Sequence, residues 1–177
     1  MGNSTANRPH EKRMIDFVAP GTSDGQQQSL LVVTLDEFRY GLPLSAVERV
    51  LRIVEITPLP KAPEIVQGII NFAGNVIAVI NIRRRFKLPA CDVRLSDHLI
   101  LARTSRRRLA LRVDSAEGFT DCTENEITSA ASVLPGLEYL RGVAKLLNGM
   151  VLIHDLDAFL SLDEEKALQA ALEGDAA

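Results

Sequence analysis

The chain has 177 residues and a formal net charge of −3, with 46% hydrophobic and 5% aromatic residues and no tryptophan. This length is enough for one domain with a hydrophobic core, or for two small subdomains that share one. A core built mainly from Val, Ile and Leu favours pleated sheets over a large aromatic pocket, and the slightly negative charge gives no general affinity for nucleic acid or anionic membranes.

Three further features limit the class of protein. No stretch approaches the roughly 18 uninterrupted apolar residues of a membrane helix, so we expect no direct membrane insertion. Residues 1–13 are polar and lack the apolar region of a secretory signal. Cys91 and Cys122 are far apart and match no metal-binding spacing, which is typical of a reduced, cytoplasmic protein.

The predicted elements begin after a polar lead, residues 1–28, which has too little apolar content to offset the entropy cost of ordering. Strands are predicted at residues 30–35 and 40–44, followed by a helical turn that leads into a strand through Ile53 and Ile56. Residues 57–63 contain three prolines and predict an irregular loop. Residues 65–72 and 76–82 predict a β-hairpin that turns at Gly74 and Asn75.

The second half of the sequence repeats the first. Residues 142–156 match residues 68–82 at a constant offset of 74, and residues 100–116 match residues 31–47 at an offset of 69. The second hairpin turns at another Gly/Asn pair, Asn148 and Gly149. We therefore expect two copies of one small barrel-like unit, at about residues 29–88 and 95–160. Each unit is too small to bury a sheet alone, which predicts an apolar seam between them.

The chain is predicted to end in a helix and tail, residues 161–177. Ser161 and Glu164 have the spacing of a capping box, in which each side chain bonds a backbone amide of the other. Leu168 and Leu172 form a narrow apolar stripe that we expect to dock on a barrel.

The strand predicted at residues 76–82 should have two apolar faces. Ile77 and Val79 should lie on one face of the sheet, and Val76, Ala78 and Ile80 on the other.

No group of residues has the pattern of a catalytic site. His154 and Asp157 lie three apart, so they should point to opposite faces of a strand and not share a metal. Both cysteines are expected to be small buried thiols. Phosphate-binding loops and nucleophile elbows are absent from the sequence. We predict a protein that is not an enzyme, with no catalytic residue, metal or cofactor.

Two arginine triplets, residues 83–85 and 106–108, are expected to be solvated charge at a strand end and at a hairpin tip, or to meet an acidic protein partner. An alternative function is a small β-barrel binding module for nucleic acid or a small ligand. That function requires aromatic side chains on the strands, and the candidates are Phe38, Tyr40, Phe72 and Phe119.

Over about residues 29–162 the sequence resembles the CheW family of chemotaxis coupling proteins. The resemblance rests on five motifs in this order: Tyr40-Gly41-Leu42-Pro43-Leu44 with Val47 and Val50; Thr57-Pro58-Leu59-Pro60 with Pro63; Val66-Gln67-Gly68-Ile69-Ile70-Asn71-Phe72 with Gly74; Val76-Ile77-Ala78-Val79-Ile80-Asn81-Ile82-Arg83; and Val113-Asp114 with Leu140-Arg141-Gly142-Val143-Ala144. Each motif alone is weak, and their order and spacing make the set specific.

The resemblance implies an all-β fold of two intertwined five-stranded β-barrels with a C-terminal helix. It also implies a cytoplasmic adaptor that couples the cytoplasmic tip of a chemoreceptor (a methyl-accepting chemotaxis protein) to a CheA-type histidine kinase in a signalling array. A receptor-binding groove between the barrels would include Val47, Arg49, Val50, Asn71, Ala73 and Gly74. The resemblance does not identify the kinase-binding residues.

The sequence departs from the family pattern at three positions. Family members typically have Arg where this chain has Ala73, and often have Glu at the position of Arg49 and Asp at that of Asn81. Arg49 together with Ala73 therefore resembles the loss of an ion pair on both sides. Two interpretations are open. The first is drift at an exposed pair worth less than about 1 kcal/mol, and the second is a changed receptor surface in a specialised or non-flagellar pathway.

Overall fold

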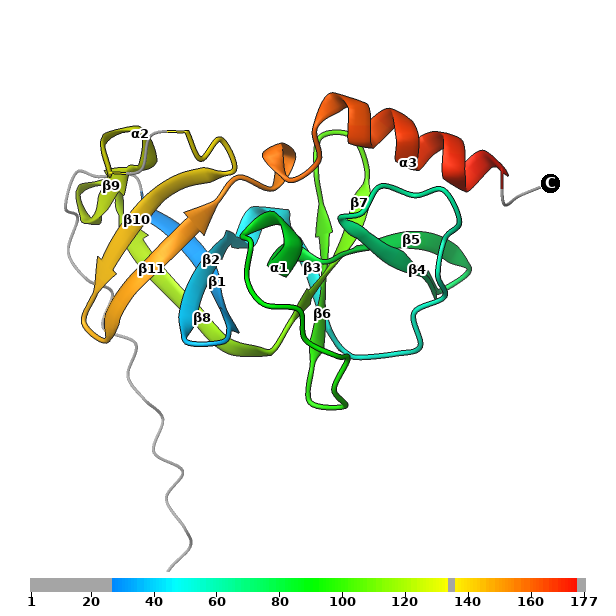
Figure 1. The fold of residues 1–177 in the computed structure, drawn as a ribbon. Helices are drawn as coiled ribbons and strands as arrows, with labels where there is room; N and C mark the ends of the chain where they lie inside the picture. Colours follow the sequence, from blue (N-terminus) through cyan, green and yellow to red (C-terminus); the bar gives the residue numbers. More distant parts are fainter. Residues whose placement is uncertain (1–26, 134–135, 175–177) are drawn as a thin grey trace, which may run out of the picture.

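The computed structural model describes residues 27–133 and 136–174, which form two β-sheets side by side and a C-terminal helix, α3 (Leu162–Gly174), that lies across one of them (Figure 1). The predicted lead, residues 1–28, falls outside the described residues except for Gln27 and Gln28, which begin the first strand. The end of the predicted tail, residues 175–177, also lies outside them.

The two sheets contain six and five strands. The six-stranded sheet has the order β8-β1-β2-β11-β10-β9, built from β1 (Gln27–Leu35), β2 (Phe38–Pro43), β8 (Ser115–Thr123), β9 (Ile127–Ser129), β10 (Leu140–Leu146) and β11 (Gly149–His154). The five-stranded sheet has the order β3-β6-β7-β5-β4, built from β3 (Val47–Arg52), β4 (Val66–Phe72), β5 (Asn75–Ile80), β6 (His98–Arg103) and β7 (Arg108–Val113). The short helices are α1 (Ile82–Arg85) and α2 (Ala130–Val133), and single 3-10 turns cover Leu44–Ala46, Glu124–Glu126 and Leu156–Ala158.

The predicted all-β class with a C-terminal helix is confirmed. One sheet has six strands where five were expected. The additional strand is the three-residue β9, which the sequence analysis did not anticipate. Within residues 27–133 and 136–174 no ladder joins β8 to β9 or β3 to β4, so neither sheet closes into a barrel. The predicted helical turn is limited to the 3-10 turn Leu44–Ala46, and the strand that follows is β3, Val47–Arg52, so the prediction of a strand through Ile53 and Ile56 is wrong.

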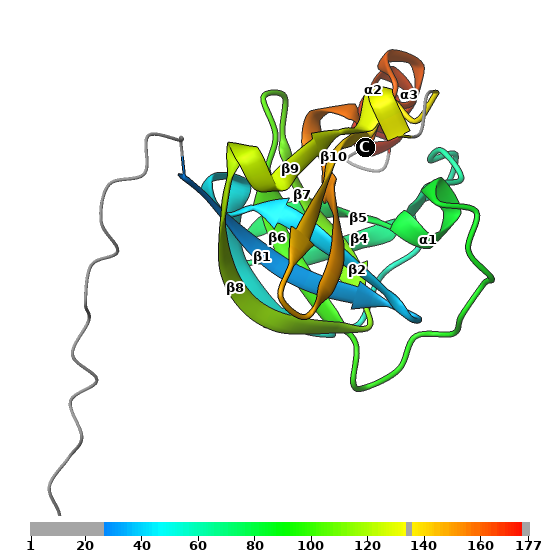
Figure 2. The ribbon, with the colours of Figure 1, turned by 90° about the vertical axis from the view of Figure 1, so that its left-hand side faces the viewer.

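Each sheet contains strands from both halves of the sequence (Figure 2). In the six-stranded sheet, β1 and β2 from the first half lie between β8 and β11 from the second half. In the five-stranded sheet, β6 and β7 from the second half lie between β3 and β5 from the first half. The halves have therefore exchanged their first two strands, and neither predicted unit corresponds to one sheet.

Two hairpins have the same strand register, at the offset found in the sequence. The β4–β5 hairpin and the β10–β11 hairpin have the same pairing at an offset of 74, including a bulge that follows Val66 in one and Leu140 in the other. At each bulge a glycine lets another chain segment approach. A Cβ on Gly68 would lie 2.3 Å from the carbonyl oxygen of Thr57, and a Cβ on Gly142 would lie 2.8 Å from that of Thr128.

The core consists of a seam between the sheets and a smaller cluster on the opposite face of each sheet, which we call the interior of that sheet. Alternate residues of β1 divide between them, since Leu31 and Val33 belong to the seam and Leu30 to the interior of the six-stranded sheet. On β5, Ile77 and Val79 fill the interior of the five-stranded sheet, and the seam receives Ala78 and Ile80. The predicted faces of this strand are confirmed, although Val76 is 59% exposed.

The helix α3 begins as predicted. The Ser161 amide donates to Glu164 Oε2 over 2.8 Å, and the Glu164 amide donates to Ser161 Oγ over 3.2 Å. Leu168 and Ala171 are buried against the seam cluster, and Leu172 packs beside them. The helix therefore covers one end of the seam.

A cluster of aromatic rings surrounds the buried His154 in the seam. The imidazole ring lies 4.5 Å from the ring centroid of Phe86 and 5.1 Å from that of Tyr40. Its Nδ1 is 3.2 Å from the carbonyl oxygen of Tyr139, and its Nε2 has no hydrogen-bond partner among the described residues. Burial lowers the pKa of His154 to about 4, so the ring is neutral at pH 7. Burial also raises the pKa of the neighbouring Tyr40 to about 12.

A buried arginine links the two sheets. Arg83 of α1 is 2% exposed, and its guanidinium donates to both carboxylate oxygens of Asp36 over 2.8 Å and to Asp114 Oδ2 over 2.6 Å. Asp36 lies in the turn between β1 and β2, and Asp114 lies where the chain passes from β7 to β8. The hydrogen bond from Arg83 lowers the pKa of Asp36, as expected for a carboxylate held by an opposite charge.

The expectation that the arginine triplets are solvated is wrong for most of their members. Arg85 donates to the carbonyl oxygen of Phe159 and to Glu164, and Arg107 and Arg108 form ion pairs with Glu165 and Glu48. Arg84 and Arg106 are exposed, although Arg84 donates to the carbonyl oxygen of Glu64. The sequence shows the positions of these charges but not the carboxylates that the fold brings to them.

Replacement of Arg83 by Met should destabilise the protein by about 3 kcal/mol, because it leaves two carboxylates without their shared partner. The matched control is Arg106→Met, which removes an exposed arginine and should change stability by less than about 0.5 kcal/mol. Urea denaturation at pH 7, followed by circular dichroism, measures both. Equal effects of the two substitutions would show that the Arg83 ion pairs contribute nothing to stability.

Acidification should destabilise the protein through His154. Since the folded-state pKa lies below the unfolded value of 6.5, the unfolded state binds the proton first, and stability falls as the pH decreases from 6.5 towards 4. The loss should approach about 3 kcal/mol, and His154→Phe should remove it. The stability that Asp36 contributes is lost only below its unfolded pKa of 3.8, outside this window. Denaturation curves at several pH values, compared between the two proteins, test this; parallel pH dependences would contradict it.

Candidate functional site

The predicted groove residues on β3 lie on two faces of the sheet. A bulge between Val47 and Arg49 makes Glu48 an extra residue. Val47 and Val50 consequently pair with Ala102 and Ile100, whose side chains belong to the seam. In a regular strand residues three apart would point to opposite faces, so the bulge is what places the two valines together.

Arg49 points to the other face of β3. It pairs with Leu101, a residue of the interior of the five-stranded sheet. Its guanidinium carbon lies 5.8 Å from the ring centroid of Phe72, which is within the range of a cation–π contact, worth about 0.5–1 kcal/mol at an exposed site. Because β3 and β4 are the two outer strands of this sheet, the contact shows that the sheet curls until its edges approach each other.

The bulge residue Glu48 belongs to an ion-pair cluster beside the valines. Its carboxylate lies 2.8 Å from Arg103 Nε and 2.6 Å from Arg108 Nη2. Hydrogen bonds from Arg103 and Arg108 lower the pKa of Glu48. The ends of β6 and β7 are thereby held against β3, which keeps the edge strand in place.

The turn of the β4–β5 hairpin lies one residue earlier than predicted. Ala73 and Gly74 are its central residues, with φ of 50° and 83°, and Phe72 pairs with Asn75. Two positive φ values define a tight type I′ turn. The Gly74 amide donates to Asn71 Oδ1 over 3.0 Å, which closes the turn. In the second hairpin the turn residues are likewise one position earlier, at Leu147 and Asn148.

The six predicted groove residues thus fall into three groups. Val47, Val50 and Asn71 are on the seam side, since Asn71 follows Ile69 by two residues and Ile69 packs on the seam. Arg49 lies on the opposite side, over Phe72. Ala73 and Gly74 form the exposed turn beside that ring. The structure brings Arg49 close to the residue before Ala73, but does not place all six on one face.

Apolar side chains remain exposed around this edge of the five-stranded sheet. Val50 is 37% exposed, Val54 49% and Val76 59%. Val76 pairs with Asn71 and shares its face. Val50 lies on the edge strand β3 beside the charged Arg49, and exposed apolar residues that adjoin one another are typical of a protein-binding surface.

Phe72 is the residue of this surface that the sequence analysis missed. The sequence analysis named it as a member of a family motif and as a candidate for base stacking, but not as a groove residue; its ring packs on the interior cluster and is covered by Arg49. The only feature of the sequence that could have assigned Phe72 to this surface is its place beside the hairpin turn. No local pattern relates it to Arg49, which lies 23 positions earlier in the chain.

The described residues contain no group of three or more His, Cys, Asp or Glu side chains that could hold a metal ion. His154 is in the aromatic cluster, whereas Asp157 is exposed and accepts a hydrogen bond from the Ser105 amide over 2.6 Å. Cys122 is buried, and this burial raises the pKa of its thiol, while Cys91 is only partly buried. In the same part of the chain no helix is long and apolar enough to cross a membrane.

Comparison with known proteins identifies relatives over most of the chain. The chemotaxis protein CheW of Treponema pallidum is 23% identical over 155 residues, which cover 84% of this chain and 91% of the relative. The chemotaxis protein CheW of Klebsiella aerogenes is 24% identical over 139 residues, which cover 77% and 84%.

A solved structure resembles the fold described above. The scaffolding protein CheW of Thermoanaerobacter tengcongensis superposes with a TM-score of 0.72 and 27% sequence identity, over 78% of this chain and 96% of that structure. The model of the CheW-like domain matches residues 29–164. This match covers more than half of the sequence and includes both sheets, and the chain therefore belongs to the CheW-like domain family.

Proposed function

We propose that this protein is a chemotaxis-type adaptor that couples the cytoplasmic tips of chemoreceptors to a CheA-type histidine kinase. The observation that carries the proposal is the match to chemotaxis proteins of this family across nearly their whole length. In this role it acts without catalysis, cofactor or metal. It would work in the cytoplasm, at receptor arrays that it reaches through protein contacts.

The surface at the edge of the five-stranded sheet is our candidate for receptor binding. It includes the exposed valines Val50 and Val76 on the seam side, Arg49 on the other side of β3, and the turn at Ala73 and Gly74. A shallow apolar strip with flanking polar groups suits an amphipathic helix, and the tip of a coiled coil presents one. The seam contains a large cluster of buried apolar residues, and in the proposed role the adaptor would hold receptor and kinase in a fixed geometry.

The alternative, a module for nucleic acid or a small ligand, is not favoured by the comparisons. Its aromatic candidates also fail to form one surface. Tyr40 is buried in the seam, and Phe72 packs on the interior under Arg49. Only Phe38 and Phe119 among the four are exposed, at 51% and 67%.

The adaptor function predicts that the full chain binds the regulatory domain of a CheA-type kinase from the same genome with a Kd of roughly 10 µM or tighter. Isothermal titration calorimetry without nucleotide, and with a chelator present, measures it. A kinase fragment that lacks the regulatory domain is the control. The proposal would be refuted if none of the CheA-type kinases encoded in that genome bound the protein.

Arg49 and Ala73 predict a receptor preference of this protein's own. The double substitution Arg49→Glu with Ala73→Arg should leave folding intact, because both side chains are exposed. It should weaken binding to the protein's own receptor by about tenfold or more, since a charge mismatch at a contact costs more than 1.4 kcal/mol.

Receptor affinity is compared for the wild type, both single variants and the double variant at two salt concentrations. Arg52→Glu is the matched control, because it reverses the charge of another exposed arginine of the same strand. Equal affinities for all variants would mean that Arg49 and Ala73 reflect drift and not a changed receptor surface.

A further inference from the structure

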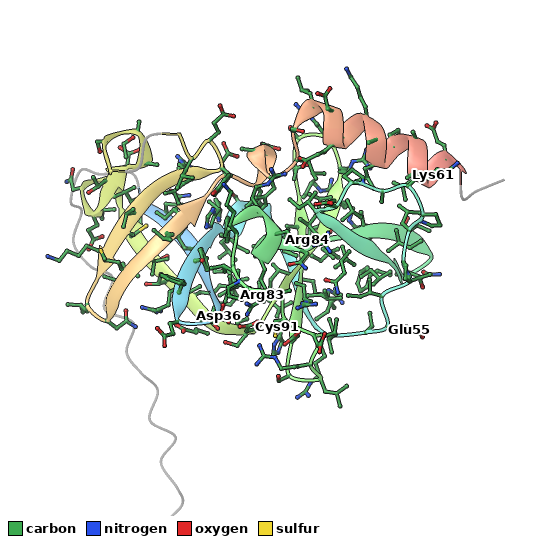
Figure 3. All side chains as sticks on the ribbon, in the orientation of Figure 1. Asp36, Glu55, Lys61, Arg83, Arg84 and Cys91 are labelled. Atoms are coloured by element: carbon green, nitrogen blue, oxygen red, sulfur yellow. The ribbon has the colours of Figure 1, made fainter. Side chains whose placement is uncertain are left out.

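The tip of the β10–β11 hairpin contains the pair Asn148-Gly149, the only asparagine in the sequence that is followed by glycine. The tip lies at the same end of the six-stranded sheet as the β1–β2 turn, where Asp36 is labelled in Figure 3. Asn148 and Gly149 are exposed, and the neighbouring Leu147 is fully exposed. Water therefore reaches this pair freely.

An asparagine that precedes glycine can react with the next backbone amide. The amide nitrogen of the following residue must approach the side-chain Cγ, and a Cβ on that residue hinders the approach. Gly149 has no Cβ, and its φ of 120° lies in the region that favours glycine. A Cβ there would lie more than 4 Å from every other described residue apart from its two neighbours in the chain. The space around the reacting atoms is therefore open.

A guanidinium group contacts both oxygen atoms of Asn148. Arg39 Nη1 donates to the backbone carbonyl oxygen over 3.2 Å and to the side-chain Oδ1 over 3.1 Å. Arg39 lies on β2, which pairs with β11. Its Nε donates to Glu117 Oε2 over 2.9 Å, and its side chain is 19% exposed. The guanidinium is thus already held beside Asn148 before any reaction.

These two oxygens are the atoms that become negative during the reaction. Loss of the Gly149 amide proton places charge on the carbonyl oxygen of Asn148, because both atoms belong to one peptide group. Attack of the nitrogen on Cγ then moves the charge to Oδ1. A nearby positive charge favours the ionised form of a group, and a donor fixed where charge develops lowers the barrier.

We propose that Asn148 is a site of spontaneous deamidation and that Arg39 promotes the reaction. The deprotonated nitrogen of Gly149 forms a bond to Cγ of Asn148, and the bond from Cγ to Nδ2 breaks. Nδ2 takes up a proton and leaves as ammonia. Water then adds across one C–N bond of the five-membered succinimide ring and opens it to aspartate or isoaspartate. No atom is oxidised or reduced.

The product carries a carboxylate beside Arg39 in place of a neutral amide. This carboxylate would compete with Glu117 for the guanidinium. It would also place a negative charge next to Leu147 and near Met150, which is 69% exposed. The inference goes beyond the adaptor role and does not depend on it, because the reaction needs only this chain and water. The charge of the hairpin tip would thus change with the age of the protein.

The first hairpin provides a matched control within the same chain. At the offset of 74, Gly74 and Asn75 stand in place of Asn148 and Gly149, in the reverse order. Asn75 is also exposed, but the residue that follows it is Val76. A branched Cβ hinders the approach of the amide nitrogen, so Asn148 should convert at least about tenfold faster than Asn75.

The test incubates the full chain at mildly alkaline pH and follows each asparagine by mass spectrometry of its peptide. Loss of ammonia and gain of water raise the mass of a converted peptide. The variant Asn148→Asp supplies the reference peptide for the aspartate product. Conversion of Asn148 well ahead of Asn75 is the expected result, and equal rates at the two positions would overturn the proposal.

Two variants test the role of Arg39, and circular dichroism checks that both remain folded. Arg39→Gln removes the positive charge and should slow the conversion of Asn148 by about threefold or more. Glu117→Gln breaks the ion pair but keeps the guanidinium beside Asn148, so the rate should not fall. The proposal would be overturned if Arg39→Gln reacted as fast as the wild type, or if both variants were slowed equally.

Discussion

The guanidinium of Arg83 holds together three parts of the chain that lie far apart in the sequence. It bonds the turn between β1 and β2 through Asp36 and the passage from β7 to β8 through Asp114. Two further hydrogen bonds join the same places: the Asp114 amide donates to the carbonyl oxygen of Thr34, and the Asp114 carboxylate accepts from the amide of Asp36. Because the two halves exchange strands, the chain passes from the five-stranded sheet to the six-stranded sheet between β7 and β8, where Asp114 lies. Residues of the seam pack beside this crossing. Since an isolated buried guanidinium would be very costly, both carboxylates are necessary.

The two halves use equivalent positions with different chemistry. The ion pair of Arg39 with Glu117 has its counterpart in that of Arg108 with Glu48, and both residues of each pair are related by the offset of 69. By contrast, the equivalents of Asp36 and Arg83 are Ser105 and Asp157, joined by a single backbone-to-carboxylate hydrogen bond. A repeated fold therefore carries a cluster of ion pairs in one half and a single backbone-to-carboxylate hydrogen bond at the equivalent place in the other. The asymmetry gives the molecule two different surfaces on one symmetrical framework.

The candidate receptor surface also depends on this framework. Its edge strand, β3, comes from the first half but pairs with β6 of the second half. The bulge at Glu48 turns the two valines to one side and Arg49 to the other. The guanidinium of Arg49 lies over the aromatic ring of Phe72. The contact holds Arg49 against the end of β4, on the far side of β3 from the valines.

Local pattern in the sequence by itself determined the class of fold, most strands, the repeat and the cap of α3 at Ser161. Alternating side chains assigned Ile77 and Val79 to one face, because a strand has a period of two. Tertiary structure decided what depends on distant residues. The burial of Arg83 required Asp36 and Asp114, the common face of Val47 and Val50 required a bulge, and the contact of Arg49 with Phe72 required the sheet to curl. The strand exchange has no local signal, because β1 and β2 have the same alternation in either sheet and only packing across the seam selects between them.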